Sequence, residues 1–197
     1  MSERLRYGAV FDGIADEYDA RRSGYPSEIV EAAVEIAGLS PGSPVVEVGA
    51  GTGKLSEELV AHGLRVDAVD PGANMLEHAR RRVGNSELVR FHIGRFEDVE
   101  LPVGEYDAVF AASSFHWVDP QLGWAKAASL LRPGGTMALV QPVGVREEPY
   151  AEAMDELHAA LVRIAPEVAA DLSRPRDLAT IRTGFEERRD NPSEAWA

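Results

Sequence analysis

The sequence contains no cysteine, which excludes disulfide bonds, thiolate metal ligands and a cysteine nucleophile. Basic residues are also few, because 20 lysines and arginines face 33 acidic residues and leave a net charge of -13. Such a charge repels a polyphosphate backbone, so we expect neither DNA nor RNA as a partner. No histidines and carboxylates stand together at ligand spacing, so we expect no metal site.

Long apolar runs are missing as well. No stretch approaches the roughly 20 residues that span a bilayer, so we expect no membrane partner. The first residues, MSERLRYGAVFDG, lack the apolar centre of a signal peptide, which predicts a cytoplasmic protein. At 197 residues the chain is near the size of one domain, and we expect a single domain over residues 1–197.

Short apolar segments alternate with segments of helical period. Five strands are predicted at Pro44–Val48, Arg65–Asp70, Leu88–Ile93, Tyr106–Ala111 and Thr136–Gln141. Helices are predicted at Val10–Ala20, from Ser27 to a stop at Gly38, and at Lys54–His62, Ala73–Val83, Asp119–Leu131 and Pro149–Ile164. This alternation implies an α/β fold with a doubly wound, mainly parallel sheet covered by helices on both faces.

The pattern weakens beyond Pro166, where only Gly184-Phe185 offers a start for another strand. The segment Arg132-Pro133-Gly134-Gly135 is predicted to end a helix and turn into the fifth strand. We expect any later strand pair to be incomplete or displaced. The edge of the fifth strand would then need cover from a tail segment or from another subunit, as in a homodimer.

A glycine-rich loop follows the first predicted strand, in the sequence VVEVGAGTGKL at positions 45–55. Gly49, Gly51 and Gly53 allow a sharp turn and a close approach of backbone to a ligand, at the edge of the sheet where ligands of such folds bind. A tight turn without a ligand is the alternative interpretation.

Acidic residues near this loop narrow the choice of ligand. A dinucleotide loop reads G-x-G-x-x-G, but position 54 is Lys54, and Glu47 precedes the loop, where its charge would repel a pyrophosphate. Asp70 ends the second strand, 17 residues after Gly53, and can accept hydrogen bonds from both hydroxyls of a ribose. Its alternative role is to cap the helix that begins at Ala73. A cofactor without phosphates, with a protonated amine and a sulfonium, suits this pattern.

The series VVEVGAGTGKL, VDAVDPG, FHIGRFED, YDAVFAASSFHW and LLRPGGTMAL resembles, in order, the motifs of class I S-adenosylmethionine-dependent methyltransferases of the type 11 group. It is most similar to the trans-aconitate methyltransferase-like branch, over Phe11 to Gln141. The resemblance implies a Rossmann-like class I fold with a lid segment over residues 1–26, a cofactor-binding core over 27–141, and a C-terminal helix and tail over 142–197. It also implies transfer of a methyl group from S-adenosylmethionine to a small-molecule acceptor.

The resemblance implies a set of cofactor-binding residues. They are Tyr18, Arg22, Glu47, Gly49, Ala50, Gly51, Asp70, Pro71, Met75, Phe96, Glu97 and Ser113. In this set, Asp70 would hold the ribose and the Phe96 amide would meet an adenine ring nitrogen. The Arg22 guanidinium can pair bidentately with the methionine carboxylate.

An acceptor pocket is predicted after the fourth strand and beneath the lid. It would be lined by Tyr25, Phe115, His116 and Trp117, whose aromatic rings suit a small organic acceptor with an apolar portion. His116 would act as a general base if the acceptor is a hydroxyl or an amine, or would be a structural histidine otherwise. Two other functions stay open: a nicotinamide-dependent oxidoreductase and a non-catalytic cofactor-binding protein.

Overall fold

The computed structural model describes residues 11–142 and 151–164. The chain divides into two units, residues 1–140 and residues 141–197. In the second unit the described element is the helix α7 (Ala151–Ile164). Within the described ranges no helix is long and apolar enough to cross a membrane. The candidate strand start at Gly184-Phe185 lies outside the described residues.

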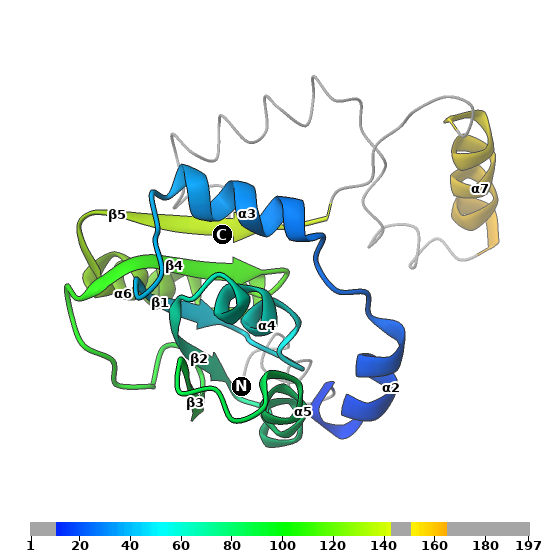
Figure 1. Cartoon of the computed structure of the whole chain (residues 1–197). Helices are drawn as coiled ribbons and strands as arrows, with labels where there is room; N and C mark the ends of the chain where they lie inside the picture. Colours follow the sequence, from blue (N-terminus) through cyan, green and yellow to red (C-terminus); the bar gives the residue numbers. More distant parts are fainter. Residues whose placement is uncertain (1–10, 143–150, 165–197) are drawn as a thin grey trace. The chain divides into compact units, whose positions relative to one another are not determined.

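The first unit contains a sheet of five parallel strands in the order β3-β2-β1-β4-β5 (Figure 1). The strands are β1 (Pro44–Val48), β2 (Arg65–Asp70), β3 (Val89–Ile93), β4 (Tyr106–Ala112) and β5 (Leu131–Val140). The chain winds outward from β1 to β3 and then crosses to β4 on the other side of β1. The carboxyl ends of β1 and β4 therefore form the switch point at which ligands of such sheets bind. The predicted Rossmann-like fold is confirmed.

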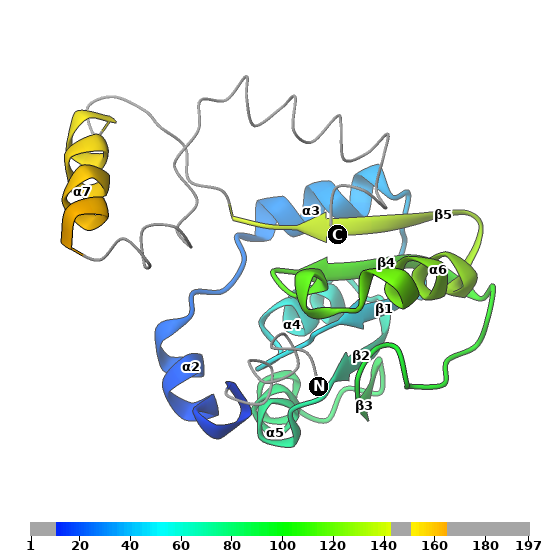
Figure 2. The same ribbon diagram turned by 180° about the vertical axis from the view of Figure 1, so that it is seen from behind.

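Helices cover both faces of the sheet (Figures 1 and 2). One face packs against α3 (Ser27–Ile36), α4 (Lys54–Ala61) and α5 (Ala73–Val83), and the opposite face packs against α6 (Pro120–Leu130). The helix α2 (Ala15–Arg21) lies beside α5, on the side toward which the strand arrows point. The helix predicted at Val10–Ala20 is interrupted: residues 11–13 are helical, Ile14 forms a turn, and α2 then continues from Ala15 to Arg21.

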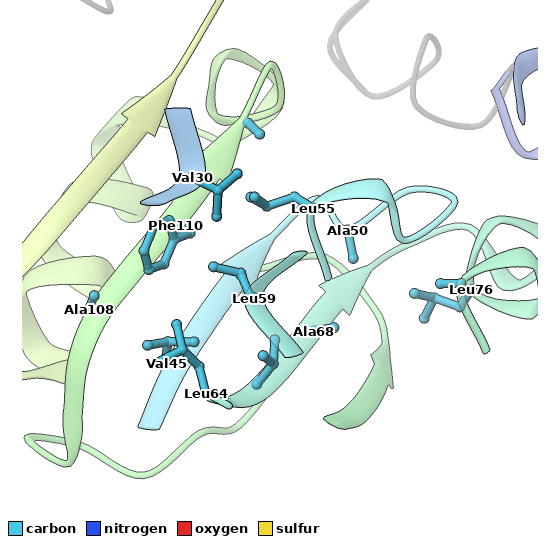
Figure 3. Close-up of a cluster of buried hydrophobic side chains, with 13 residues drawn as sticks. Val30, Val45, Ala50, Leu55, Leu59, Leu64, Ala68, Leu76, Ala108 and Phe110 are labelled. Atoms are coloured by element: carbon cyan, nitrogen blue, oxygen red, sulfur yellow. The ribbon is translucent and has the colours of Figure 1, made fainter. Parts of the chain in front are cut away.

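Alternating side chains of β1 feed two apolar cores. Val45 faces the α4 side, where it belongs to the same buried cluster as Leu59 and Phe110, and Figure 3 shows side chains of this cluster. Val46 and Val48 belong to the second cluster, on the α6 side. Both clusters hold β1 rigidly in the middle of the sheet, so the loop that follows it starts from a fixed position.

The fifth strand is longer than the predicted Thr136–Gln141. It starts at Leu131, directly after α6, where Leu131 pairs with Tyr106, and the ladder resumes with Thr136 opposite Ala108. The Pro-Gly-Gly segment therefore forms an irregularity inside the strand and not a turn ahead of it. Proline lacks a backbone donor and Gly134 has a φ of +82°, so both residues suit a bulge.

Candidate functional site

The glycine loop is fastened to the end of β2 by backbone hydrogen bonds. The amides of Gly49 and Ala50 both donate to the carbonyl of Val69, at 2.8 and 3.0 Å. The amide of Gly51 donates to Oδ2 of Asp70 at 2.8 Å. Gly49, Gly51 and Gly53 all have positive φ, at 71°, 55° and 82°. The loop is thus a rigid turn, and glycine at each of these positions avoids backbone strain.

The three glycines differ in what a side chain would meet. A Cβ at Gly49 would lie 2.4 Å from Cβ of Ser114, and one at Gly53 would lie 2.7 Å from Cα of Ala79. A Cβ at Gly51 would meet nothing within 4 Å. Packing therefore requires Gly49 and Gly53, whereas Gly51 presents its backbone to open space that a ligand can use.

Asp70 is fixed by two backbone donors. Its Oδ2 accepts from Gly51 and its Oδ1 accepts from Gly72, each at 2.8 Å, and the residue is buried. Burial raises the pKa of this carboxyl, while the hydrogen bonds from Gly72 and Gly51 act in the opposite direction. Each oxygen keeps a lone pair, so the side chain can still accept hydrogen bonds from a diol.

Asp70 does not cap α5, so that alternative role is excluded. The amides of Asn74 and Met75 in the first turn of α5 donate instead to Oδ1 of Asp12, at 2.8 and 3.3 Å. Asp12 comes from the N-terminal segment, 62 residues before Asn74. No local sequence pattern indicates this cap, because Asp12 is brought to the helix by tertiary packing.

Glu47 was expected to be a charged carboxylate, but its surroundings favour the neutral acid. It is 2 % exposed, and its Oε2 accepts a 2.5 Å hydrogen bond from Oγ of Ser56 on α4. Its pKa is raised to about 8, because burial and the charge of Asp70 together outweigh the lowering effect of the Ser56 hydrogen bond. The carboxyl is therefore mainly protonated at pH 7. The expected repulsion of a pyrophosphate by Glu47 loses its electrostatic basis, because a neutral acid carries no charge.

The N-terminal segment reaches the ends of β2 and β4. Nη2 of Arg22 donates to Oγ of Ser113 at 3.0 Å, and the Tyr25 hydroxyl donates to the carbonyl of Ala112 at 3.2 Å. Burial raises the pKa of Tyr18, Arg22 lowers it, and Tyr25 and Asp70 raise it. Hence Tyr18, Arg22 and Tyr25 of the N-terminal segment lie near the switch point, together with Ser113 at the end of β4.

Ser113 has a left-handed backbone, with a φ of +52°, which no other non-glycine residue in the described ranges shares. Such a conformation costs on the order of 1 kcal/mol or more and tends to persist at functional sites. Here it directs the hydroxyl to Arg22, while the Ser113 amide donates to the carbonyl of Val140 at 2.9 Å. The strain therefore coincides with a contact between β4 and the N-terminal segment.

The predicted cofactor residues that follow β2 and β3 differ in their exposure and in their contacts. Pro71 is exposed beside Asp70, and Met75 and Phe96 are buried, at 4 and 3 %. Burial raises the pKa of Glu97, but hydrogen bonds from the Asp119 amide and from Arg95 lower it overall. Both of these donors lie at 2.8 Å from Oε1 of Glu97. Glu97 therefore ties the segment after β3 to the start of α6.

Three of the predicted acceptor residues form the short helix η1 (Phe115–Trp117), where their side chains have different environments. Phe115 packs into the α6-side core, with its ring centroid 4.7 Å from that of Trp124. His116 is exposed, and its ring lies 4.6 Å from the ring of Trp117. The Trp117 ring also lies 6.1 Å from Phe11, which packs edge-on against Tyr18.

An aromatic contact thus joins η1 to the N-terminal segment through Phe11, a residue that the sequence analysis did not single out. Three residues per turn of a 3₁₀ helix place consecutive side chains on different sides, which explains why Phe115 is separated from its neighbours.

Among the residues that the structure describes, no group of three histidines and carboxylates could hold a metal ion.

Comparison with known proteins agrees with this geometry. Residues 46–139 match the family described as methyltransferase domain. An uncharacterized methyltransferase of Mycobacterium tuberculosis is 36% identical over 130 residues, which are 66% of this chain and 51% of the relative. The chain therefore spans about half the length of the curated relatives it matches.

Two solved structures show the same fold. One is assigned as a type II methyltransferase from Anaeromyxobacter dehalogenans; it has 30% identity and a TM-score of 0.59, with 72% of this chain and 59% of that chain covered. The other is a complex of DhpI with SAH, with 27% identity, a TM-score of 0.55, and 73% and 72% covered. The family match and the named relatives do not favour the nicotinamide alternative. The strand order and these two structures show the class I methyltransferase fold, and residues 46–139 resemble the methyltransferase domain family.

Proposed function

We propose that this domain transfers a methyl group from S-adenosylmethionine to a small organic acceptor by in-line displacement. The observation that carries the proposal is the pairing of an open glycine with an anchored acid. Gly51 offers space for a ligand, and the Asp70 carboxyl beside it is held by two backbone amides. The SAH bound to DhpI, which shares 27% identity with this chain, supports the choice of cofactor.

The described side chains suit both ends of that cofactor. Asp70 would accept hydrogen bonds from the ribose hydroxyls, because each of its oxygens keeps a free lone pair. Arg22 would pair with the methionine carboxylate, since its described partner is the neutral hydroxyl of Ser113, whereas Arg82 already pairs with a carboxylate. Gly49 and Ala50 keep the loop bound to β2, so the site is formed before the ligand arrives.

S-adenosylmethionine supplies a methyl group on a sulfonium, whose departure leaves a neutral thioether. The protein therefore has to orient the reactants and keep water away from them. The ring of Phe11 makes edge-on contacts with both Tyr18 and Trp117, and so joins the N-terminal segment to η1. These rings would present apolar surface to the acceptor. His116, next to Trp117, would remove a proton from a hydroxyl or amine acceptor, and would only orient a carboxylate.

Calorimetry with S-adenosylhomocysteine tests the donor site. The wild type should bind it, and Asp70→Ala should weaken binding by about 10-fold to 100-fold, because a charged acceptor of hydrogen bonds is lost. Asp98→Ala is the matched control, since Asp98 is an exposed acid whose removal leaves the loop intact. Equal affinities in the two variants would remove the ribose role of Asp70, and binding of NADH in place of S-adenosylhomocysteine would remove the proposed function.

The acceptor can be found with methyl-labelled S-adenosylmethionine. The protein is incubated with a mixture of small metabolites, and mass spectrometry reports which compound gains the labelled methyl group. A product with an apolar portion would agree with the aromatic surface. Tight cofactor binding without any methylated product, across a broad mixture, would favour the non-catalytic alternative.

A further inference from the structure

The three consecutive arginines at the end of α5 have different environments. From sequence, this run would simply complement the negative end of the helix dipole. In the structure the Arg80 guanidinium lies over the ring of Phe91, and Arg81 pairs with Glu77 on the exposed face of α5. The Arg82 side chain instead extends from α5 to the glycine loop, to α2 and to α4.

Arg82 uses each of its three nitrogens. Nε donates to the carbonyl of Thr52 at 3.0 Å, Nη2 donates to Oδ1 of Asp19 at 2.7 Å, and Nη1 donates to Oε2 of Glu57 at 3.3 Å. Thr52 lies between Gly51 and Gly53 in the glycine loop, Asp19 is on α2, and Glu57 is on α4. One planar guanidinium therefore connects the glycine loop to α2, with donors spread over three nitrogens, whereas all donors of an ammonium lie on a single atom.

Asp19 is held from a second direction. Nζ of Lys54 lies 3.1 Å from its Oδ1 and donates to its backbone carbonyl at 3.1 Å. His78 lies close as well, with Nδ1 3.8 Å from Oδ2 of Asp19. Burial would raise the pKa of Asp19, but its hydrogen bonds, among them those from Lys54 and Arg82, lower it to about 2. Asp19 is thus ionised at any ordinary pH.

These contacts are partly shielded from water. The exposed fractions are 24 % for the side chain of Asp19, 25 % for Arg82 and 12 % for Lys54. Ion pairs in such positions are screened less than pairs on an open surface, and several charges here form one network. By contrast, the side chains of Arg81 and Glu77 are more than half exposed.

We propose that Arg82 is a positioning residue that joins the glycine loop to α2, so that a ligand of the loop binds tightly only while α2 is docked. The inference rests on the proposed function, because it takes the glycine loop as the cofactor site. Arg82 itself contacts the loop through the carbonyl of Thr52 and would act through the loop and through Tyr18 and Arg22, which α2 brings to the site. If the docked state becomes less populated, the apparent dissociation constant rises by the same factor.

The experiment compares Arg82→Gln with Arg81→Gln, its neighbour with a single exposed partner. In calorimetry with S-adenosylhomocysteine, Arg82→Gln should raise Kd about tenfold or more, and Arg81→Gln should change it less than about twofold. Arg82→Lys should recover part of the loss by restoring the charge. Asp19→Asn should weaken binding too, and the double variant should lose less than the product of the two single effects.

Hydrogen exchange of the unliganded proteins gives a readout that does not depend on binding. Arg82→Gln should speed exchange of the α2 amides and leave β1 unchanged, whereas Arg81→Gln should match the wild type. Equal α2 exchange and equal Kd in the two variants would overturn the inference. Failure of the wild type to bind S-adenosylhomocysteine would instead overturn the proposed function, and the exchange comparison would still test the link between the loop and α2. If Arg82→Gln does not fold, Asp19→Asn replaces it, with Glu17→Gln as its control, because Glu17 is an exposed acid of the same helix.

Discussion

Glu47 shows how one buried side chain changes its chemistry with its surroundings. In water a glutamate is ionised above pH 5, but here Glu47 is buried in the middle of the sheet, where the Ser56 hydroxyl donates a hydrogen bond to its carboxyl. Burial, with a smaller contribution from the charge of Asp70, raises the pKa from 4.5 to about 8 despite the Ser56 hydrogen bond. The charged form is therefore unfavourable in the folded protein, and a cationic group of a bound cofactor would favour it again.

This pKa predicts a particular dependence of stability on pH. Between pH 4.5 and about 8 the folded state keeps a proton that the unfolded state releases, so Glu47 contributes less to stability as the pH rises, and its contribution is lost above pH 8. Glu47→Gln keeps an acceptor for Ser56 and cannot ionise. The variant should therefore gain stability relative to the wild type, on the order of a few kcal/mol, between pH 5 and pH 9.

Urea unfolding at several pH values measures this difference. Glu35→Gln, which removes an exposed carboxyl, controls for the change in net charge. A difference between Glu47→Gln and wild type that stays constant with pH would mean that Glu47 is ionised throughout, and would contradict the assignment.

At the scale of elements, two glycines of the loop serve different purposes: Gly51 leaves space for a ligand, and Gly49 allows the fold to pack. Gly51→Ala places a Cβ in open space, so the folded protein should lose only about 1 kcal/mol of stability from the left-handed backbone. Its affinity for S-adenosylhomocysteine should fall at least about tenfold, because the added methyl group occupies ligand space. Gly49→Ala should destabilise the fold itself, because its Cβ would lie 2.4 Å from Cβ of Ser114.

The matched control is Gly104→Ala. Gly104 also has a positive φ, of 72°, and open space around its missing side chain, but it lies in the loop before β4, away from the glycine loop. The two variants should have equal melting temperatures within error, and only Gly51→Ala should bind poorly. Normal binding by Gly51→Ala would show that the ligand does not approach this glycine.

What the sequence predicts at this scale depends on how local the signal is. The bounds of β1, β2 and α5 follow from apolar alternation and helical period between glycines, and all three were predicted correctly. Asp12, which caps α5, and Asp19, which pairs with Arg82, act across 62 and 63 residues. No local pattern reports such contacts, since packing of α2 against α5 creates them. Phe115 was misplaced for a related reason: Trp117 of the same short helix contacts Phe11 of the N-terminal segment, but the Phe115 side chain fills the core.

For the whole molecule, parallel topology followed from the alternation of strands and helices, and the family resemblance was confirmed at the level of the class I fold. The start of β5 could not be predicted, because Arg132-Pro133-Gly134-Gly135 has the composition of a turn. In the structure Nη1 of Arg132 lies 2.8 Å from Oδ1 of Asp107, next to Tyr106 of the adjacent strand. This tertiary contact helps to hold the segment in the strand despite its composition.

The free edge of β5 gives the last prediction. Within the described residues β5 pairs only with β4, and its apolar residues from Met137 to Val140 are half-buried. An edge of this length and apolarity favours pairing with another segment. We expect the β5 amides that face away from β4 to exchange slowly in the whole chain, close to the rate of β1, which has neighbours on both sides.

Hydrogen exchange over a range of protein concentrations measures this protection and shows its source. Protection that is independent of concentration would mean that a tail segment of the same chain covers β5, because an intramolecular contact does not dilute. Protection that falls on dilution, together with a falling molecular mass in light scattering, would mean that a second subunit covers it. Central β1 amides serve as the internal reference, since their ladders to β2 and β4 are complete. Rapid exchange along β5 at every concentration would contradict the prediction, because it would show that the edge of the sheet stays open to water.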